Sequence, residues 1–533
     1  MKRLIRGGLV YDGTGCSPVK ADVLIDGDRI AAIASDLSLE NAEVIDATGL
    51  VVTPGFIDMH RHADIAPLQT PDFGEVELRQ GITATFTGNC GIANVPVAAH
   101  SREEYRSFVT PIIGQAGENS LFESYAEYRI AMEKAELPIH MGFLAGTGAV
   151  KVAVKGFSPT PYTPQELLRA QAYVREAMEQ GAFGVSLGFM YQPECYTTPE
   201  EQIAVIRPAA QAGGLLTTHI RGEGNSLVGS VREVLDIADR AGIRVHISHF
   251  KATGIRNWCS TIFTAMEEIE RARSAGREVT ADFYPYAGGS TTIFSLIPPC
   301  VLRDNNEQTI AYLATAEGKA RLREAIDRDD PRWDNMALSI GWGRIVIAGA
   351  SLPEHEHYNG RSVDELFQEE GYAHASDFLC DLLVSEEGRV GIIVLSMDPE
   401  DVDAVARLPY TAVISDSLYG PSEHPHPRLY GTFPRFLHDF ALTRGVLKPE
   451  EAFRKMTSFP AHLLGLRDRG TLRPGAWADV NLFELGSLCD HATYEQSTQL
   501  CTGLSRMLLS GRDVVVDDRI TARSQGRVLL KND

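Results

Sequence analysis

The sequence has no run of about 18 apolar residues, the length that a membrane-spanning helix needs. Its first residues, "MKRLIRGGLVYDG", are basic but lack the apolar segment and cleavage pattern of a secretory signal. The eight cysteines form no CxxC pair and show no regular spacing, so a disulfide framework is not expected. These absences predict a soluble, cytoplasmic protein without membrane partners.

Basic residues are also in deficit: 50 Lys and Arg stand against 71 Asp and Glu, which gives a net charge of −21. This balance disfavours nucleic acids and anionic membranes, because their phosphates would repel the chain. An anionic small molecule is not excluded, since a pocket can be locally basic. Apolar residues make up 44% of the 533 residues, enough for one large domain with a smaller one, or for three ordinary domains.

After Pro54, short apolar runs alternate with longer amphipathic stretches. The spacing predicts helices over 163–181, where Glu166 can complete a capping box, and over 229–242. Strands that alternate with helices are typical of an α/β protein, here a (β/α)₈ barrel. The eight predicted strands are "GFIDMHRH", "ITATFTGNC", "IHMGFLAGT", "AFGVSLGF", "GLLTTHI", "RVHISHF", "EVTADFYPY" and "TAVISDS".

The sequence pattern at both chain ends differs from that of the barrel, because strands there are separated by turns and not by helices. The pattern predicts strands and turns in residues 1–53, with a hairpin around Asp26–Asp28, and again strands and turns in residues 466–533. We expect the two ends to form a small β-sandwich beside a catalytic barrel of residues 54–465. Between the seventh and eighth strands, residues 291–405 form an insertion, which is either a candidate lid over the barrel or a structural excursion.

Metal-binding residue types stand at the ends of five predicted strands. The active sites of such barrels lie at the carboxyl ends of the strands, so these side chains converge on one rim. Zinc and related metals are held by such N, S and O donors. Six donors exceed one tetrahedral site, so two adjacent metal positions are expected, with Cys90 or water between them. The candidate ligands are His60, His62, Cys90, His219, His249 and Asp416.

Each of these residues alone has a plainer interpretation. A single histidine at a strand end is more often structural, and a single cysteine such as Cys90 is more often a small buried apolar residue. Asp416 can also be read as a helix cap. His246, three residues before His249, is interpreted as structural or as supporting a ligand. The joint pattern favours the metal, because six donors at the same end of five strands are improbable by accident.

Two motifs resemble the amidohydrolase superfamily: "PGFIDMHRH" where the barrel begins and "RPGAWADV" where it ends. More narrowly, the chain resembles the N-acyl-D-amino-acid deacylases, or D-aminoacylases. The resemblance spans nearly the whole chain in the right order. Its motifs are "TGNCGI", "TTHIRGEG", "VHISHFKATG", "DFYPYAGGST", "HPHPRLYGTFPR" and "MTSFPAHLLGL".

The resemblance implies that the same six residues surround the metal, with the cysteine in place of the carboxylated lysine of other amidohydrolases. It further implies one zinc ion held tightly by Cys90, His219 and His249, and a second, weaker position. The chain departs from the family in two places. The usual "GHG" of the third strand reads "GTG" at 146–148, and Arg61 stands between the first two histidines.

The implied reaction is the hydrolysis of an N-acyl-D-amino acid to a carboxylate and a free D-amino acid. Asp416 is placed to take a proton from water and pass it to the leaving nitrogen. Lys251, two residues after His249, would hold the substrate carboxylate if the strand continues. By resemblance, Tyr191, Tyr284 and Ser290 are candidate substrate contacts; each can also be a solvated rim residue.

Arg221 is a further candidate substrate contact, although it can equally form a structural ion pair with Glu223. Two other functions remain as alternatives to the deacylase. The first is a cyclic-amide hydrolase such as a hydantoinase or dihydroorotase, which the Cys90 motif and "HFKATG" disfavour. The second is a metal-free scaffold, which the presence of all six candidate ligands disfavours.

Overall fold

The computed structural model describes residues 2–38, 41–303, 305–329, 333–420, 422 and 424–531. Its centre is a closed ring of eight parallel strand positions, each at one of the eight predicted runs. At three of these eight positions the strand is divided into two short segments. In chain order the strands are β6 (Phe56–Asp58) with β7 (Arg61–His62), β8 (Ile82–Thr87), β9 (His140–Phe143) with β10 (Ala145–Gly146), β11 (Gly184–Gly188), β12 (Leu215–His219), β13 (Arg244–Ile247), β14 (Val279–Phe283), and β18 (Thr411–Val413) with β19 (Ser417–Leu418).

The ring closes between its last and first strands. β19 pairs in parallel with β7, with Ser417 opposite Arg61. Just before that pair, the Asp416 N–H donates to the carbonyl of His60 at 3.0 Å. Closure therefore brings together two candidate ligands that are 356 residues apart in the sequence.

Helices connect successive strands of the ring, as the amphipathic stretches predict. The predicted helix over 163–181 is α6, and its Thr163–Glu166 capping box is present. Within the described part of the chain, no helix combines the length and apolar character that a bilayer crossing requires. The helices are α1 (Ala66–Gln69), α2 (Glu75–Arg79), α3 (Arg102–Ile113), α4 (Tyr125–Lys134), α5 (Thr147–Lys155), α6 (Pro164–Glu179), α7 (Pro199–Gln211), α8 (Leu227–Ala241), α9 (Thr261–Ser274), α15 (Pro399–Arg407), α16 (Arg428–Arg435), α17 (Pro449–Met456) and α18 (Ser458–Leu464).

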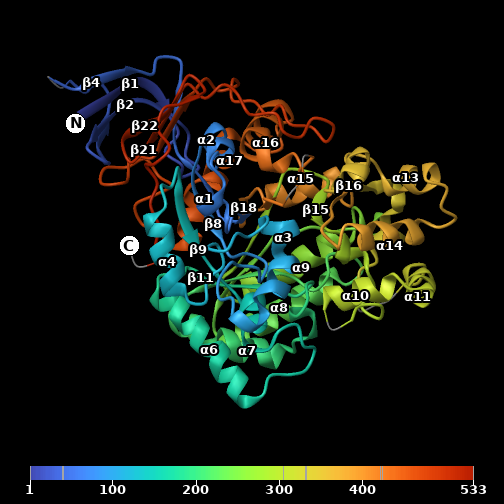
Figure 1. Ribbon diagram of the computed structural model, residues 1–533. Coiled ribbons are helices and arrows are strands. Elements are labelled where there is room, and N and C mark those ends of the chain that lie inside the picture. Colours follow the sequence, from blue (N-terminus) through green and yellow to red (C-terminus); the bar gives the residue numbers. More distant parts are fainter. Residues whose placement is uncertain are drawn as a thin grey trace.

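Strands from both chain ends pair in one nine-stranded sheet beside the barrel (Figure 1). The predicted hairpin is present, with Asp26 opposite Arg29 across a two-residue turn. The two ends meet where β20 pairs antiparallel with β5. The division into two layers and the domain boundaries stay predictions. The strands are β1 (Lys2–Val10), β2 (Val19–Asp26), β3 (Arg29–Ala34), β4 (Glu43–Asp46), β5 (Val51–Pro54), β20 (Val480–Phe483), β21 (Arg506–Leu509), β22 (Arg512–Val516) and β23 (Arg519–Ile520).

The segment between β14 and β18 folds as a separate unit with its own apolar core, and its helices lie on the far side of the barrel from the end sheet (Figure 1). Its three antiparallel strands lie next to the barrel mouth, where Ser290 on β15 reaches the central pocket. Movement of this unit as a lid stays a prediction. Its elements are β15 (Gly289–Thr292), β16 (Ile345–Gly349), β17 (Gly391–Val394), α10 (Asn306–Leu313), α11 (Ala316–Ile326), α12 (Met336–Ile340), α13 (Val363–Glu369) and α14 (Ala375–Ser385).

Candidate active site

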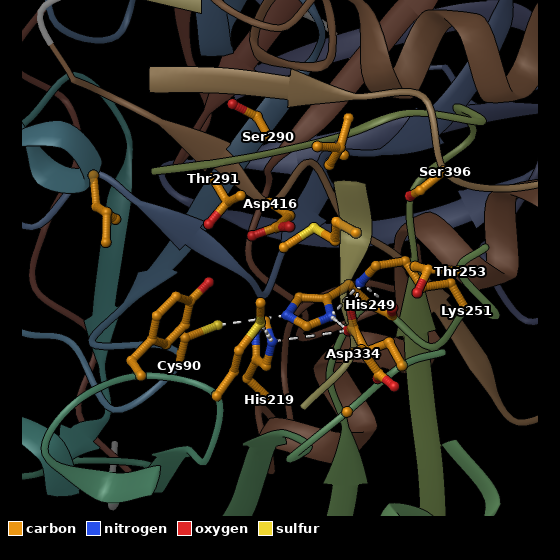
Figure 2. A pocket seen from close by; sticks show the side chains of 18 of the residues that line it. Cys90, His219, His249, Lys251, Thr253, Ser290, Thr291, Asp334, Ser396 and Asp416 are labelled. Carbon is orange, nitrogen blue, oxygen red and sulfur yellow. Dashed lines mark hydrogen bonds and ion pairs between the residues drawn. The ribbon is translucent and has the colours of Figure 1, made fainter. Parts of the chain in front are cut away.

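The six candidate metal ligands lie together at the carboxyl ends of the barrel strands, and all are buried. The Cys90 sulfur lies 3.3 Å from His60 Nε2 and 3.6 Å from His249 Nε2. Asp416 Oδ1 lies 3.3 Å from His60 Nε2 and 3.5 Å from His62 Nε2. In Figure 2, Cys90, His219 and His249 form one side of this cluster and Asp416 lies across from them.

The donor atoms fall into three overlapping groups, and within each group they lie within 4.8 Å of one another. The groups are His60–His62–Cys90, Cys90–His219–His249, and His60–His249–Asp416. Burial disfavours the Cys90 thiolate, but His60 and the hydrogen bonds from His219 and His249 hold its pKa well below the usual value. A buried thiolate among imidazoles is a ligand set that suits zinc, so these residues fit such an ion.

Three of these residues have an unusual backbone conformation. The φ angles are +53° at Cys90, +37° at His249 and +48° at Asp416, a region that side chains other than glycine rarely adopt. Such residues cost of order 1–3 kcal/mol each and persist only where the surrounding structure enforces them. The fold therefore aims these three side chains into the cluster against their local preference.

Lys251 reaches the pocket by a different route from the predicted one. Strand β13 ends at Ile247, so strand alternation does not extend to Lys251. Instead the loop turns back, and the Lys251 ammonium donates to the His249 carbonyl at 3.0 Å and to Glu223 Oε1 at 2.5 Å. Glu223 Oε1 also lies 2.9 Å from His249 Nδ1. Glu223 thus connects the lysine to a candidate ligand, a role that the sequence interpretation missed.

The alternative interpretation of Arg221, a structural ion pair with Glu223, is wrong. The Arg221 guanidinium donates to both carboxylate oxygens of Glu233, at 3.0–3.2 Å, and to the Cys195 carbonyl at 2.8 Å. Glu233 lies on α8, 12 residues after Arg221 in the sequence, whereas the alternative had used the nearest carboxylate. Glu223 is already paired with Lys251.

One pocket contains the cluster and the candidate substrate contacts. It encloses about 840 Å³ of non-atom space, including space open to solvent. The insertion contributes part of the wall through residues such as Ser290, Asp334 and Ser396 (Figure 2). The pocket is lined by five of the six candidate ligands, all but His60, and by every predicted substrate contact, Lys251, Tyr191, Tyr284, Ser290 and Arg221.

The model of the amidohydrolase family matches residues 43–289 and 411–521. The chain belongs to the amidohydrolase family. The unmatched residues between the two segments coincide with the insertion between β14 and β18.

Named relatives cover nearly the whole of this amidohydrolase. An N-acyl-D-glutamate deacylase from Alcaligenes xylosoxydans xylosoxydans is 33% identical over 99% of this chain and 96% of its own length. A D-aminoacylase structure, studied for the role of its binuclear metal centre, has 31% identity and a TM-score of 0.82 over 99% of both chains. An N-acyl-D-glutamate deacylase from Bordetella bronchiseptica, complexed with zinc and a phosphonate inhibitor, has 29% identity and a TM-score of 0.81 over 99% of both chains.

The two departures from the family pattern have structural consequences in this amidohydrolase. Arg61 points away from the cluster: it is buried, and its guanidinium pairs with Asp58 at 3.1 Å and Glu77 at 3.2 Å. In the "GTG" segment the residue that departs is Thr147, which is buried and donates its hydroxyl to the Ser186 carbonyl at 2.9 Å. The glycines on either side pack under the loop that carries Cys90. A Cβ on either Gly146 or Gly148 would come within 2.7 Å of the Gly91 carbonyl oxygen, so both positions require glycine.

Asp282 on β14 is a second residue that the sequence interpretation missed. Its carboxylate lies 2.9 Å from His246 Nε2 and 3.4 Å from His60 Nδ1, and it accepts the N–H of His249. Such a carboxylate fixes the orientation of a ligating imidazole. The expected supporting role of His246 fits this contact. The available signal was a charged residue inside a short strand, "VTADF", whose other residues are uncharged.

Asp282→Asn is expected to weaken metal affinity about 10- to 100-fold, because the amide loses the charge that orients His60 and keeps only one of the two oxygens that face His60, His246 and His249. The measurement is the zinc retained against a series of chelators. The matched control is Asp479→Asn, because Asp479 is another buried carboxylate that faces a histidine, 3.4 Å from His140 Nε2 and outside the pocket. Equal zinc affinities in the two variants would contradict a positioning role for Asp282.

Proposed function

We propose that this amidohydrolase uses zinc to hydrolyse N-acyl-D-amino acids to a carboxylate and a free D-amino acid. The observation that carries the proposal is a cluster of six candidate ligands beside a cation, Lys251, in one pocket. The names of the relatives, two N-acyl-D-glutamate deacylases and a D-aminoacylase, support the substrate class. Cys90, His219 and His249 would hold the firmer zinc ion, with a weaker position among His60, His62 and Asp416.

A bound zinc ion lowers the pKa of its water to about 7 and polarises a carbonyl group. Asp416 supplies the proton transfer, since its Oδ1 faces the cluster while its Oδ2 lies 2.9 Å from the Arg428 guanidinium. Burial disfavours the charged carboxylate, but Arg428 and His60 hold the pKa of Asp416 well below its usual value. Asp416 is therefore ionised, and its Oδ1, which Arg428 does not hold, is the oxygen that can accept a proton and pass it to the leaving nitrogen.

Lys251 has one N–H left for the substrate carboxylate. An ammonium has three donors, and Lys251 gives one to Glu223 and one to the His249 carbonyl. Its nitrogen also lies 2.9 Å from His249 Nδ1. If His249 holds the metal through Nε2, its Nδ1 would carry a proton and donate to Glu223, so it could not accept from the lysine. The third lysine N–H would then be free to donate to a carboxylate in the pocket, which Lys251 lines.

Chirality tests this proposal. The acyl carbonyl, the carboxylate and the side chain are held at three fixed points, so the wrong enantiomer misplaces one of them. We expect kcat/KM for an acyl-D-amino acid to exceed that for its L form by at least about 100-fold, the worth of one charged hydrogen bond and some packing. Equal rates for both enantiomers would refute the proposal. Hydrolysis of a hydantoin or dihydropyrimidine in place of the linear amide would favour the cyclic-amide alternative.

Lys251→Met is expected to raise KM for the acyl-D-amino acid about 10- to 150-fold, because a hydrogen bond to a charged group is worth about 1.5–3 kcal/mol. The same variant should barely change the KM of a substrate whose carboxylate is amidated. Lys155→Met is the control, since Lys155 also pairs with a glutamate, Glu166 at 3.4 Å, but lies outside the pocket. An unchanged KM in Lys251→Met would place the carboxylate anchor elsewhere.

A further inference from the structure

A second, larger cavity lies beside the candidate active site. It encloses about 1250 Å³ of non-atom space, including space open to solvent. Its walls come from α3, from the loop after β11 and from the start of the insertion. The apolar part of the lining includes Phe108, Phe189, Phe294, Ile297, Pro299 and Leu302.

The second cavity adjoins the catalytic pocket on the His219 side. The two share Met190, Tyr191, Arg221 and Trp333 as lining residues. The Met190 sulfur lies 3.2 Å from His219 Nε2, and the Tyr191 ring centre lies 4.9 Å from that of His219. Met190 and Tyr191 therefore form the boundary between the metal cluster and the cavity, and a group bound at the cluster has to pass them to enter it.

The described lining of the second cavity carries little charge. Among the described residues that line it, Arg221 alone carries a charge, and its guanidinium is held by Glu233 and the Cys195 carbonyl. Gln192 donates its side-chain N–H to Tyr196 at 2.6 Å. The space therefore suits an aliphatic or aromatic occupant.

The order of groups along the pocket identifies that occupant. Lys251 lies on one side of His249, and Cys90 and His219 lie on the other (Figure 2). In the substrate the carboxylate, the α-carbon, the nitrogen, the acyl carbonyl and the acyl chain follow one another. With the carboxylate at Lys251 and the carbonyl at the cluster, the acyl chain continues away from Lys251, toward Met190 and Tyr191.

We propose that the second cavity binds the hydrocarbon chain of the acyl group, so that the preferred substrates are N-acyl-D-amino acids with medium or long acyl chains. This inference rests on the proposed function, because it assumes a linear amide with its carboxylate at Lys251. The opposite assignment, in which the cavity takes the amino-acid side chain, requires that chain to pass the metal cluster.

Two isomeric substrates distinguish these assignments. N-Octanoyl-D-alanine and N-acetyl-D-2-aminononanoate have the same atoms, but the long chain lies on opposite sides of the amide. Each methylene that enters the cavity is worth roughly fourfold in kcat/KM. With half of the six additional acyl methylenes buried, kcat/KM for the octanoyl isomer should exceed that for the acetyl isomer by at least about 20-fold.

Ser295→Trp tests whether the preference arises in this cavity. Ser295 lines it and donates its hydroxyl to the carbonyl of Thr292, three residues earlier, at 2.7 Å. Ser385 is the matched control: it lies in the same insertion and donates to the carbonyl of Leu382 at 3.1 Å, but it does not line the cavity. Ser295→Trp should reduce the octanoyl-to-acetyl ratio at least tenfold, and Ser385→Trp should leave the ratio unchanged.

The outcomes separate the two proposals. If neither isomer is hydrolysed, and simple acetyl-D-amino acids are not hydrolysed either, the proposed function fails. If the acetyl isomer is hydrolysed at least as well as the octanoyl isomer, the deacylase stands and the acyl-chain cavity is refuted. An octanoyl preference that survives Ser295→Trp unchanged would also refute it. In each assay the folded state of the variants is checked by thermal unfolding.

Discussion

Replacement of Cys90 by alanine is expected to remove most of the bound zinc and nearly all of the activity together. The sulfur belongs to two of the three groups of donor atoms, so its loss weakens both potential metal positions. Since removal of a supporting contact alone costs 10- to 100-fold in metal affinity, loss of the thiolate should cost more than about 100-fold. Zinc content per chain and kcat/KM are measured on the same preparation.

A second variant measures how much activity is lost merely because a buried sulfur is replaced by a smaller side chain. Cys501→Ala removes a sulfur that is equally buried, but Cys501 donates to the Tyr430 carbonyl at 3.0 Å and does not line the pocket that holds the cluster. Alanine at position 90 keeps the Cβ, so the left-handed backbone there is not relieved. Full activity and full zinc content in Cys90→Ala would remove Cys90 from the ligand set.

The sequence predicts the candidate ligands well because they depend on the strand pattern. Each stands at or within three residues of the end of a barrel strand, and parallel strands end at one rim. The pattern did not predict how three of them are aimed. Cys90, His249 and Asp416 lie beyond their strands in a left-handed conformation, which side-chain alternation does not describe.

The supporting charges could not be assigned from the sequence, because their partners are distant in the chain. Asp282 touches His246 and His60, which come from two other strands. Arg428, which contacts Asp416, comes from the helix after the last strand, and the sequence interpretation named it only as part of a motif. Arg221 was paired with the nearest carboxylate in the sequence, whereas packing of α8 provides Glu233.

The eight strands and the insertion were also predictable, since apolar runs and helix caps are local signals. The fold of the insertion was not. The runs "RIVIAGA" and "VGIIVLSM" contain β16 and β17, and β15 pairs with β17 rather than with a barrel strand. Pairing of strands that are about 100 residues apart depends on how the insertion packs its own core, and no short sequence pattern records that packing.

Asp416→Asn is expected to keep the firmer zinc ion but to lower kcat by about 10²- to 10⁴-fold, the usual cost of a lost general acid or base. Zinc should remain because Cys90, His219 and His249 form a complete group without Asp416. The amide cannot accept and return a proton, so water activation and protonation of the leaving nitrogen fail together. The measurements are single-turnover rates and zinc content.

Asp416→Asn also leaves Arg428, which is buried, without its charged partner, and a broken buried ion pair can lower stability by 3–5 kcal/mol. Arg428→Met breaks the same pair from the other side and keeps the carboxylate. If the ion pair were the only role of Asp416, both variants would lose activity equally. We expect Arg428→Met to remain at least ten times more active than Asp416→Asn, because the proton carrier is still present. Near-normal turnover in Asp416→Asn with zinc bound would assign the proton transfer to another group.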